Sequence, residues 1–275
     1  MSQLLALISA VFYGFGDFVG GFATRRMALW RVTAWSMLIG VALLITGLFL
    51  VPAESVEPAD LLWGAAAGVA GLVGLALLYS TLAAGSMTIV APISGVTAAA
   101  LPVVFDLAGG STLTLRQWFG IGLALAAVTL VGTDTDHEGV NLRIVARAVL
   151  AGAAFGVFFI ALSQTSADSG LWPLVGARAV AIPLAFAGAF ATSSVRAPAG
   201  RDLGMVAVLG GLDMSANIAV ALALQLGPVG INSVLSSLYP VFTVIAAIVL
   251  LREQPTRRQI FAVALAMGAI IALAV

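Results

Sequence analysis

Ten stretches of the chain are almost entirely apolar and close to the roughly 20 residues that a helix needs to cross the hydrocarbon core of a bilayer. Polar and turn residues lie between these stretches and mark their ends. The pattern predicts ten transmembrane helices, at Leu4–Ala23, Arg31–Val51, Leu61–Ala84, Thr88–Ala108, Gln117–Thr133, Ala148–Gln164, Trp172–Ala191, Gly204–Leu226, Ile231–Leu251 and Gln259–Val275.

Composition supports an integral membrane protein and excludes several kinds of chemistry. The chain is 61% hydrophobic and 9% charged, whereas a soluble domain has about 25% charged residues. It contains no Cys, and all twelve basic residues are Arg. Disulfides, thiolate metal sites, Schiff-base chemistry and a nucleotide-binding loop with its Lys are therefore excluded. The single His137 lies in an acidic connector, so we expect neither a metal site nor a cofactor, and the net charge of zero gives no sign of a nucleic-acid partner.

The second half of the chain repeats the first at a constant offset of 142 residues. Residue types that are rare in this chain coincide under that shift: Trp30 with Trp172, Gly68 with Gly210, Ser94 with Ser236, and Arg116–Gln117 with Arg258–Gln259. We therefore predict two repeats, at residues 1–136 and 143–275, with five spans each. An odd number of spans inverts the second repeat relative to the first. Inverted repeats around a central cavity are typical of secondary transporters, which bind substrate near the midplane.

The distribution of Arg predicts the orientation of the chain. Ten Arg residues lie in the odd-numbered connections between spans and one, Arg116, lies in the even-numbered connections. Because Arg and Lys are enriched in cytoplasmic loops, we expect the odd connections in the cytoplasm and both termini outside.

Several motifs resemble those of a known family. They are the Ser-Leu-Tyr-Pro run at Ser237–Pro240, the Leu-Leu-Arg-Glu-Gln-Pro-Thr run at Leu250–Thr256, and the segment Tyr13–Gly21. Together with the five-plus-five pattern, they resemble the drug/metabolite transporter superfamily, specifically its EamA-like ten-helix branch. The Leu-x-Glu before the last helix of a repeat is absent from the first repeat, which has Gly110 and Ser111 at the equivalent place.

The resemblance implies a fold and an activity. Helices one to four and six to nine would surround a central cavity, with helices five and ten outside it. Members move amino acids, other metabolites or drugs across the cytoplasmic membrane, often outward. The family is usually described with cytoplasmic termini, in conflict with the Arg distribution of this chain, and here we follow the Arg distribution.

Charged residues inside the spans are candidates for function, because they are costly in a bilayer. Asp17, Arg178 and Asp213 lie well inside spans one, seven and eight, and the 142-residue shift duplicates none of them. This asymmetry favours a single binding site in which Asp17 or Asp213 exchanges a proton for substrate. The alternative is a structural ion pair between Arg178 and one of the two Asp residues. Asp106 is within a turn of the end of span four, where we expect a solvated position.

Uncharged polar residues extend this candidate site. Asn217 lies four residues after Asp213 and Tyr13 four residues before Asp17, so each shares a helix face with its Asp. Both are candidates for substrate contact, although hydrogen bonding or packing between helices is an equally good explanation.

Prolines and serines mark spans four and nine. We expect Pro92, Pro102 and Pro240 to interrupt these helices and act as hinges, because each Pro removes a backbone hydrogen bond. The repeat-related Ser94 and Ser236, together with Tyr239, lie beside the prolines. Polar residues at broken helices in corresponding positions of two halves indicate a binding site, so these three residues complete the list of substrate-binding candidates.

The sequence as a whole predicts a multi-pass protein of the cytoplasmic membrane that is no enzyme. Its expected function is secondary active export of small metabolites, such as amino acids or amphipathic compounds, by alternating access with proton exchange. The alternatives are a facilitative uniporter without coupling and a lipid-handling membrane protein. The expected partners are a small-molecule substrate and the lipid bilayer.

Overall fold

The computed structural model describes residues 1–82, 87–131, 142–251 and 256–274, and these residues form helices and connecting segments without any strand. In chain order the helices are α1 (Ser2–Thr24), α2 (Leu29–Leu50), α3 (Pro58–Leu82), α4 (Met87–Ala108), α5 (Leu115–Val131), α6 (Leu142–Ser163), the 3-10 helix η1 (Ala167–Ser169), α7 (Trp172–Ala191), α8 (Arg201–Gln225), α9 (Val229–Ser236), α10 (Tyr239–Leu251) and α11 (Arg257–Ala274). Each predicted span corresponds to one helix, except the ninth, which is divided between α9 and α10.

Length and composition identify the membrane spans directly. Within the described residues, α1, α2, α3, α6, α7 and α8 are long and apolar enough to cross a membrane. Shorter apolar helices occur at Ile93–Ala108, Leu115–Leu130 and Ile260–Leu273. Many large apolar side chains on the outer helix faces are exposed, among them Leu62 and Phe190, whereas buried positions are often Ala. Large side chains facing outward and small ones between helices are the arrangement that lipid favours.

The prolines act differently in the two repeats. The ninth span is broken between Ser236 and Tyr239, and Pro240 is the second residue of α10. The prediction of an interruption in the fourth span is wrong, because α4 continues through both Pro92 and Pro102. Neighbouring helices and local adjustment of the backbone allow Pro within a membrane helix. Of the three predicted hinge positions, only Pro240 adjoins a break.

Hydrogen bonds between connections define the sides of the membrane domain. Near the two ends of the chain, the Gln3 side-chain amide donates to the carbonyl of Leu273 at 3.0 Å, so both ends lie on one side. The first turn of α3 and the segment before α7 are joined where the Ser166 backbone N–H donates to the Asp60 carboxylate at 2.8 Å. The indole of Trp35, near the start of α2, donates to the carbonyl of Val195, between α7 and α8. These pairings are the ones expected of a chain that crosses the membrane with each successive span.

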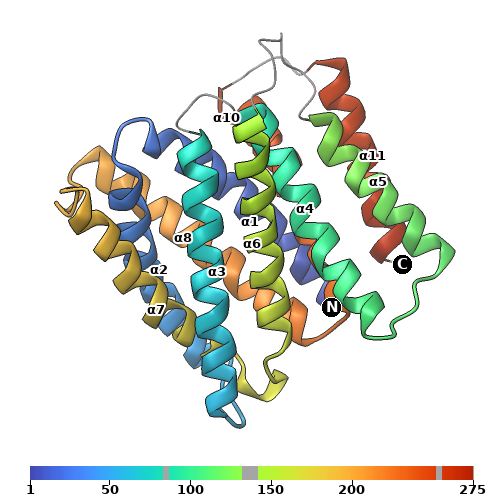
Figure 1. Ribbon diagram of the computed structural model, residues 1–275, viewed down its shortest axis with the longest axis horizontal. Coiled ribbons are helices and arrows are strands. Elements are labelled where there is room, and N and C mark those ends of the chain that lie inside the picture. The colour runs from blue at the N-terminus through green and yellow to red at the C-terminus, as the bar shows by residue number, and fades with distance from the viewer. Residues whose placement is uncertain (83–86, 132–141, 252–255, 275) are drawn as a thin grey trace.

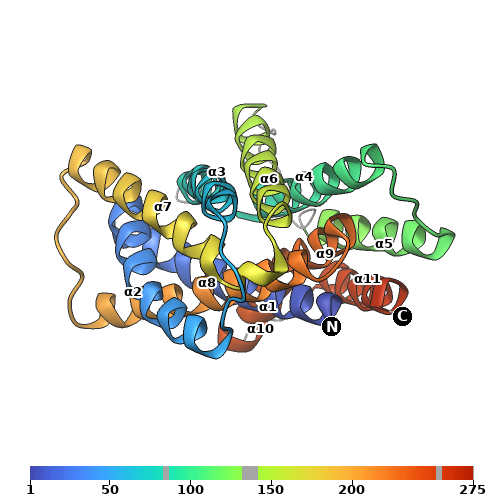
Figure 2. The ribbon, with the colours of Figure 1, turned by 90° about the horizontal axis from the view of Figure 1, so that it is seen from below.

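The helices form two layers, each built from both repeats (Figure 2). One layer contains α7, α3, α6, α4 and α5, and the other contains α2, α8, α1, α9–α10 and α11. Exchanging the repeats converts one layer into the other, and the packing follows that exchange. In the first layer α3 packs on α6 and α7, and in the second α8 packs on α1 and α2. This correspondence supports the predicted pseudo-two-fold relation between inverted repeats. Helices α5 and α11 pack together at one edge (Figure 1).

Repeat-related glycines bring the helices of each layer into backbone contact. A Cβ at Gly68 of α3 would overlap the backbone of Ala177 in α7, and a Cβ at Gly210 of α8 would overlap the backbone of Ser36 in α2. Glycine is required at both places because the helix backbones themselves approach. The two contacts correspond to within one residue under exchange of the repeats, and they hold the helices that enclose the central cavity.

Candidate functional site

A cavity of about 80 Å³ lies between the two layers, with room for several water molecules. It is lined by residues of α1, α2, α3, α6, α7 and α8 and by Tyr239 at the start of α10. No described side chain of α5 or α11 lines it, in agreement with the expectation from the family resemblance. Among the α4 residues whose side chains the structure describes, 93–108, none lines the cavity either, and in this respect these residues differ from that expectation.

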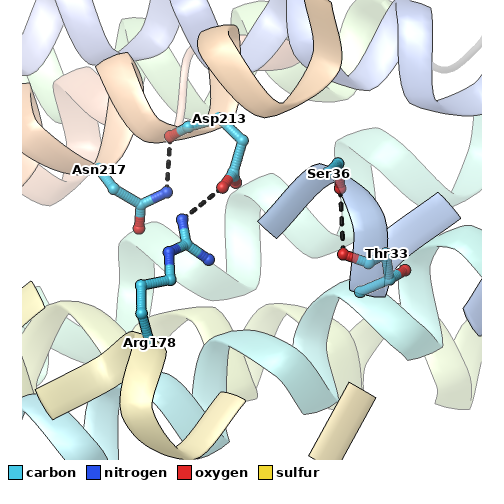
Figure 3. Close-up of polar contacts among 5 residues, drawn as sticks. All are labelled: Thr33, Ser36, Arg178, Asp213 and Asn217. Carbon is cyan, nitrogen blue, oxygen red and sulfur yellow. Dashed lines mark hydrogen bonds and ion pairs between the residues drawn. The ribbon is translucent and has the colours of Figure 1, made fainter. Parts of the chain in front are cut away.

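An ion pair between α7 and α8 lies at the wall of the cavity. The Arg178 guanidinium donates to the Asp213 carboxylate (Figure 3). Asp213 is the thirteenth of the 25 residues of α8 and is therefore at mid-depth in the membrane. The side chains are 10% and 20% exposed. Of the two pairings that the sequence left open for Arg178, the structure has the one with Asp213.

Asn217 supports the same part of α8. Its side-chain amide donates to the Asp213 backbone carbonyl at 2.6 Å (Figure 3), one helical turn away. The residue also lines the cavity. The hydrogen bond lies within α8, whereas the sequence interpretation had it between helices, and contact of Asn217 with substrate stays a prediction.

The ion pair has no counterpart in the first repeat. Under the 142-residue shift Arg178 corresponds to Ser36 and Asp213 to Gly71. Ser36 is buried in α2 and donates to the carbonyl of Thr33 at 3.1 Å (Figure 3). The scaffold is thus two-fold in its packing, whereas the ion pair occurs in the second repeat alone.

Asp17 is the third charged residue of the cavity wall. It lies on α1, half-buried, and lines the cavity. No hydrogen bond or ion pair joins it to any residue that the structure describes, in contrast to Asp213. Tyr13 lies one turn earlier on the same helix and lines the cavity as well. Asp17 therefore presents the one carboxyl group of the described cavity wall that has no cationic partner.

Aromatic side chains form much of the remaining wall. The chain has three Tyr residues, and all three, Tyr13, Tyr79 and Tyr239, line the cavity. Phe155, Phe158 and Phe159 of α6 line it as well. Tyr79 and these Phe residues are not among the residues predicted from the sequence. The scarcity of Tyr in the chain is the signal that would have found Tyr79.

The two serines of the candidate site lie behind the wall. Ser94 is fully buried, and its hydroxyl is 2.8 Å from the hydroxyl of Tyr239. Ser236 is also fully buried and accepts a hydrogen bond from the Ser9 hydroxyl at 2.8 Å. Neither lines the cavity. Ser94 positions a residue that does, and Ser236 joins α9 to α1.

Asp106 differs from the expectation of a solvated helix end. Its carboxylate accepts a hydrogen bond from the Gly230 backbone N–H at 2.8 Å, so it caps the beginning of α9. The residue connects the end of α4 to the broken ninth span and lies outside the cavity wall.

Comparison with known proteins identifies the family. The family model described as "EamA-like transporter family" matches residues 1–133 and again residues 142–275. The chain belongs to the EamA-like transporter family. Because the family consists of membrane transporters of small molecules rather than enzymes, the chain is a multi-pass membrane transporter. The two matched regions correspond to the two repeats seen in the sequence.

Two further similarities concern length and fold. An uncharacterized protein of Methanocaldococcus jannaschii, MJ1333.1, is 28% identical over 131 residues, which are 46% of this chain and 93% of that protein. That relative is thus about as long as one repeat. A solved crystal structure superposes with a TM-score of 0.80 at 19% identity, covering 98% of this chain and 95% of the other. At this identity the second similarity concerns the fold alone.

Proposed function

We propose that this EamA-like transporter is a secondary active exporter that moves small metabolites out of the cell in exchange for protons, by alternating access. The observation that carries the proposal is the Asp17 carboxyl group, which faces the cavity without a partner among the described residues. Such a group is negatively charged when deprotonated and neutral when protonated. A single proton therefore changes the net charge of the cavity.

The contacts favour Asp17 over Asp213 as the group that exchanges the proton. The charge of Asp213 is compensated by Arg178, and protonating it would leave the guanidinium unpaired at mid-depth, which is unfavourable in a low-dielectric site. Asp17 has no such constraint. In this proposal Arg178 and Asp213 keep the wall rigid and polar, while Asp17 alternates between proton and substrate.

The architecture supports alternating access. The cavity lies between two layers that are related by exchange of inverted repeats, so conformations open to either side have similar packing. Energy from ATP requires a nucleotide-binding loop, which the sequence lacks. With the Arg-rich connections in the cytoplasm, protons entering from outside would drive substrate outward.

The proposal is tested in two steps. A metabolite-wide comparison of efflux from cells with and without the protein identifies a substrate. Its flux is then measured in proteoliposomes with and without a pH gradient. We expect the wild-type protein to accumulate substrate against its gradient when the pH gradient drives it. An equal flux with and without the pH gradient would instead identify a uniporter.

Variants of the two Asp residues separate coupling from structure. Asp17→Asn should abolish accumulation driven by the pH gradient, because Asn can neither take up nor release the proton. Asp213→Asn serves as the matched control, because it removes a charge from the same wall and should lower the rate without abolishing the pH dependence. Wild-type pH dependence in Asp17→Asn would overturn the assignment.

A further inference from the structure

The charge balance of the cavity indicates what it binds. Among the lining residues, Asp17, Arg178 and Asp213 are the charged ones. Arg178 and Asp213 neutralise each other in an ion pair, which leaves one carboxylate. A ligand that complements this wall carries one positive charge and needs no negative group.

The aromatic wall supports the same conclusion. Six aromatic residues surround the cavity, the three Tyr and the three Phe named above. The faces of aromatic rings attract cations, and groups of them bind alkylated ammonium ions in particular, since these ions combine a positive charge with an apolar surface. Aromatic walls with a single free carboxylate suit such ions better than sugars or anions, which would need several hydrogen-bond donors.

We propose that the substrate class of this transporter is small organic monocations of the alkylammonium type, held by Asp17 and the aromatic wall. The inference rests on the transport function proposed above. The small volume of the cavity favours ions with few carbon atoms over large amphipathic drugs.

A cation at Asp17 has a consequence for coupling. The ammonium ion and a proton compete for the same carboxylate, so the carboxyl group releases one proton when the cation binds and takes one up when it leaves. One positive charge is then exchanged for another, and the complete cycle moves no net charge across the membrane. The pH gradient drives this exchange, whereas the membrane potential does not.

Binding of matched probes to the purified protein in lipid nanodiscs tests the substrate class. Calorimetry compares tetramethylammonium with tert-butyl alcohol, and n-butylammonium with butan-1-ol, so that each cation has a neutral counterpart of similar shape. We expect at least one cation to bind about tenfold more tightly than its counterpart, and to bind more weakly as the pH falls. Equal affinities for cation and alcohol in both pairs would overturn the proposal.

Glycine betaine adds a carboxylate to the trimethylammonium group and so tests the role of Arg178. Because Arg178 is already paired, glycine betaine should bind more weakly than tetramethylammonium. Tighter binding of glycine betaine would mean that the ion pair opens to receive a carboxylate. The substrate class would then be zwitterions, and the monocation proposal would be wrong.

Variants locate the cation. Asp17→Asn should bring the ratio of cation to alcohol affinity close to one, whereas Asp17→Glu, which keeps the charge, should retain most of the preference. Tyr13→Leu should reduce cation affinity more than Tyr13→Phe does, because only Phe keeps a ring. Thermal unfolding of each variant establishes that it is folded. Unchanged preference in folded Asp17→Asn, or equal losses in the two Tyr13 variants, would contradict the proposed mode of binding.

Failure of this inference can be distinguished from failure of the transport function. If proteoliposomes exchange protons for a neutral or zwitterionic metabolite but transport neither tetramethylammonium nor n-butylammonium, the proposed substrate class is wrong and proton-coupled export stands. If cations bind as described but their flux ignores the pH gradient, the substrate class stands and the coupling is wrong.

Discussion

Removing one partner of the ion pair should cost far more stability than removing both. In Arg178→Met the Asp213 carboxylate loses its cation, and in Asp213→Leu the guanidinium loses its anion. Breaking a buried pair by removing one partner typically costs 3–5 kcal/mol. The side chains here are 10% and 20% exposed, and water in the cavity screens part of the charge. We therefore expect each single substitution to lower the free energy of unfolding by about 3 kcal/mol.

The double variant tests whether the two charges interact directly with each other. With Met and Leu in place of the two charges, no charge remains to be solvated, and apolar replacement of a buried pair is often neutral or stabilising. We expect the double variant to be no less stable than either single variant, although the individual losses sum to about 6 kcal/mol. Such non-additivity is the measure of direct interaction between two side chains.

Thermal unfolding of the purified protein in detergent, followed by helical circular dichroism, provides the measurement. At 2–4 °C per kcal/mol for a chain of this size, each single substitution should lower Tm by about 6–12 °C. The double variant should lower Tm by no more than either single substitution does. A double variant that loses the sum of both single losses would show that the two charges act independently, and the assignment of a structural ion pair would have to be withdrawn.

Two further predictions concern packing and orientation. Gly68→Val should lower stability by about 2 kcal/mol or more, because its side chain would meet the backbone of Ala177, whereas Gly122→Ala, where an added Cβ meets nothing within 4 Å, should remain within about 1 kcal/mol of wild type in the same unfolding assay. The absence of Cys allows clean labelling of single Cys variants in intact cells. With both termini outside, an impermeant maleimide should label Ser111→Cys but not Ala199→Cys, and the reverse result would invert the proposed orientation.

The helices could be predicted from the sequence because a bilayer imposes a length. Apolar stretches near 20 residues admit few alternatives, and every predicted span lies within a few residues of an observed helix. The effect of Pro was harder to predict. Pro240 adjoins a break while Pro102 lies inside a continuous helix, because the neighbours of each helix decide whether the backbone can remain helical. Neighbours cannot be deduced from one span at a time.

The charged residues of the candidate site could be predicted from the sequence, but the rotation of each helix about its own axis could not. The cost of charge inside a span singled out Asp17, Arg178 and Asp213, and the structure brings all three to one cavity. The choice of partner for Arg178 depends on how α7 turns toward α8 or α1, which the sequence does not specify. Tyr79 and the Phe residues of α6 were missed for a related reason. Composition alone does not show whether an aromatic residue of a membrane helix faces the lipid or a cavity.

The contrast between symmetric packing and asymmetric charge suggests that the helix interfaces and the charged residues have different roles in the transporter. Gly68 and Gly210 make similar backbone contacts in the two layers, so the interfaces that would adjust during the proposed alternating access belong to both repeats. Asp17, Arg178 and Asp213 have no counterparts under the 142-residue shift, and they define one site rather than two. Substitutions at the glycine interfaces should therefore change the rate at which the protein alternates between its two conformations while leaving substrate selectivity unchanged. Substitutions at Asp17 should change selectivity and coupling, since its carboxyl group is the one proposed to bind both the proton and the substrate.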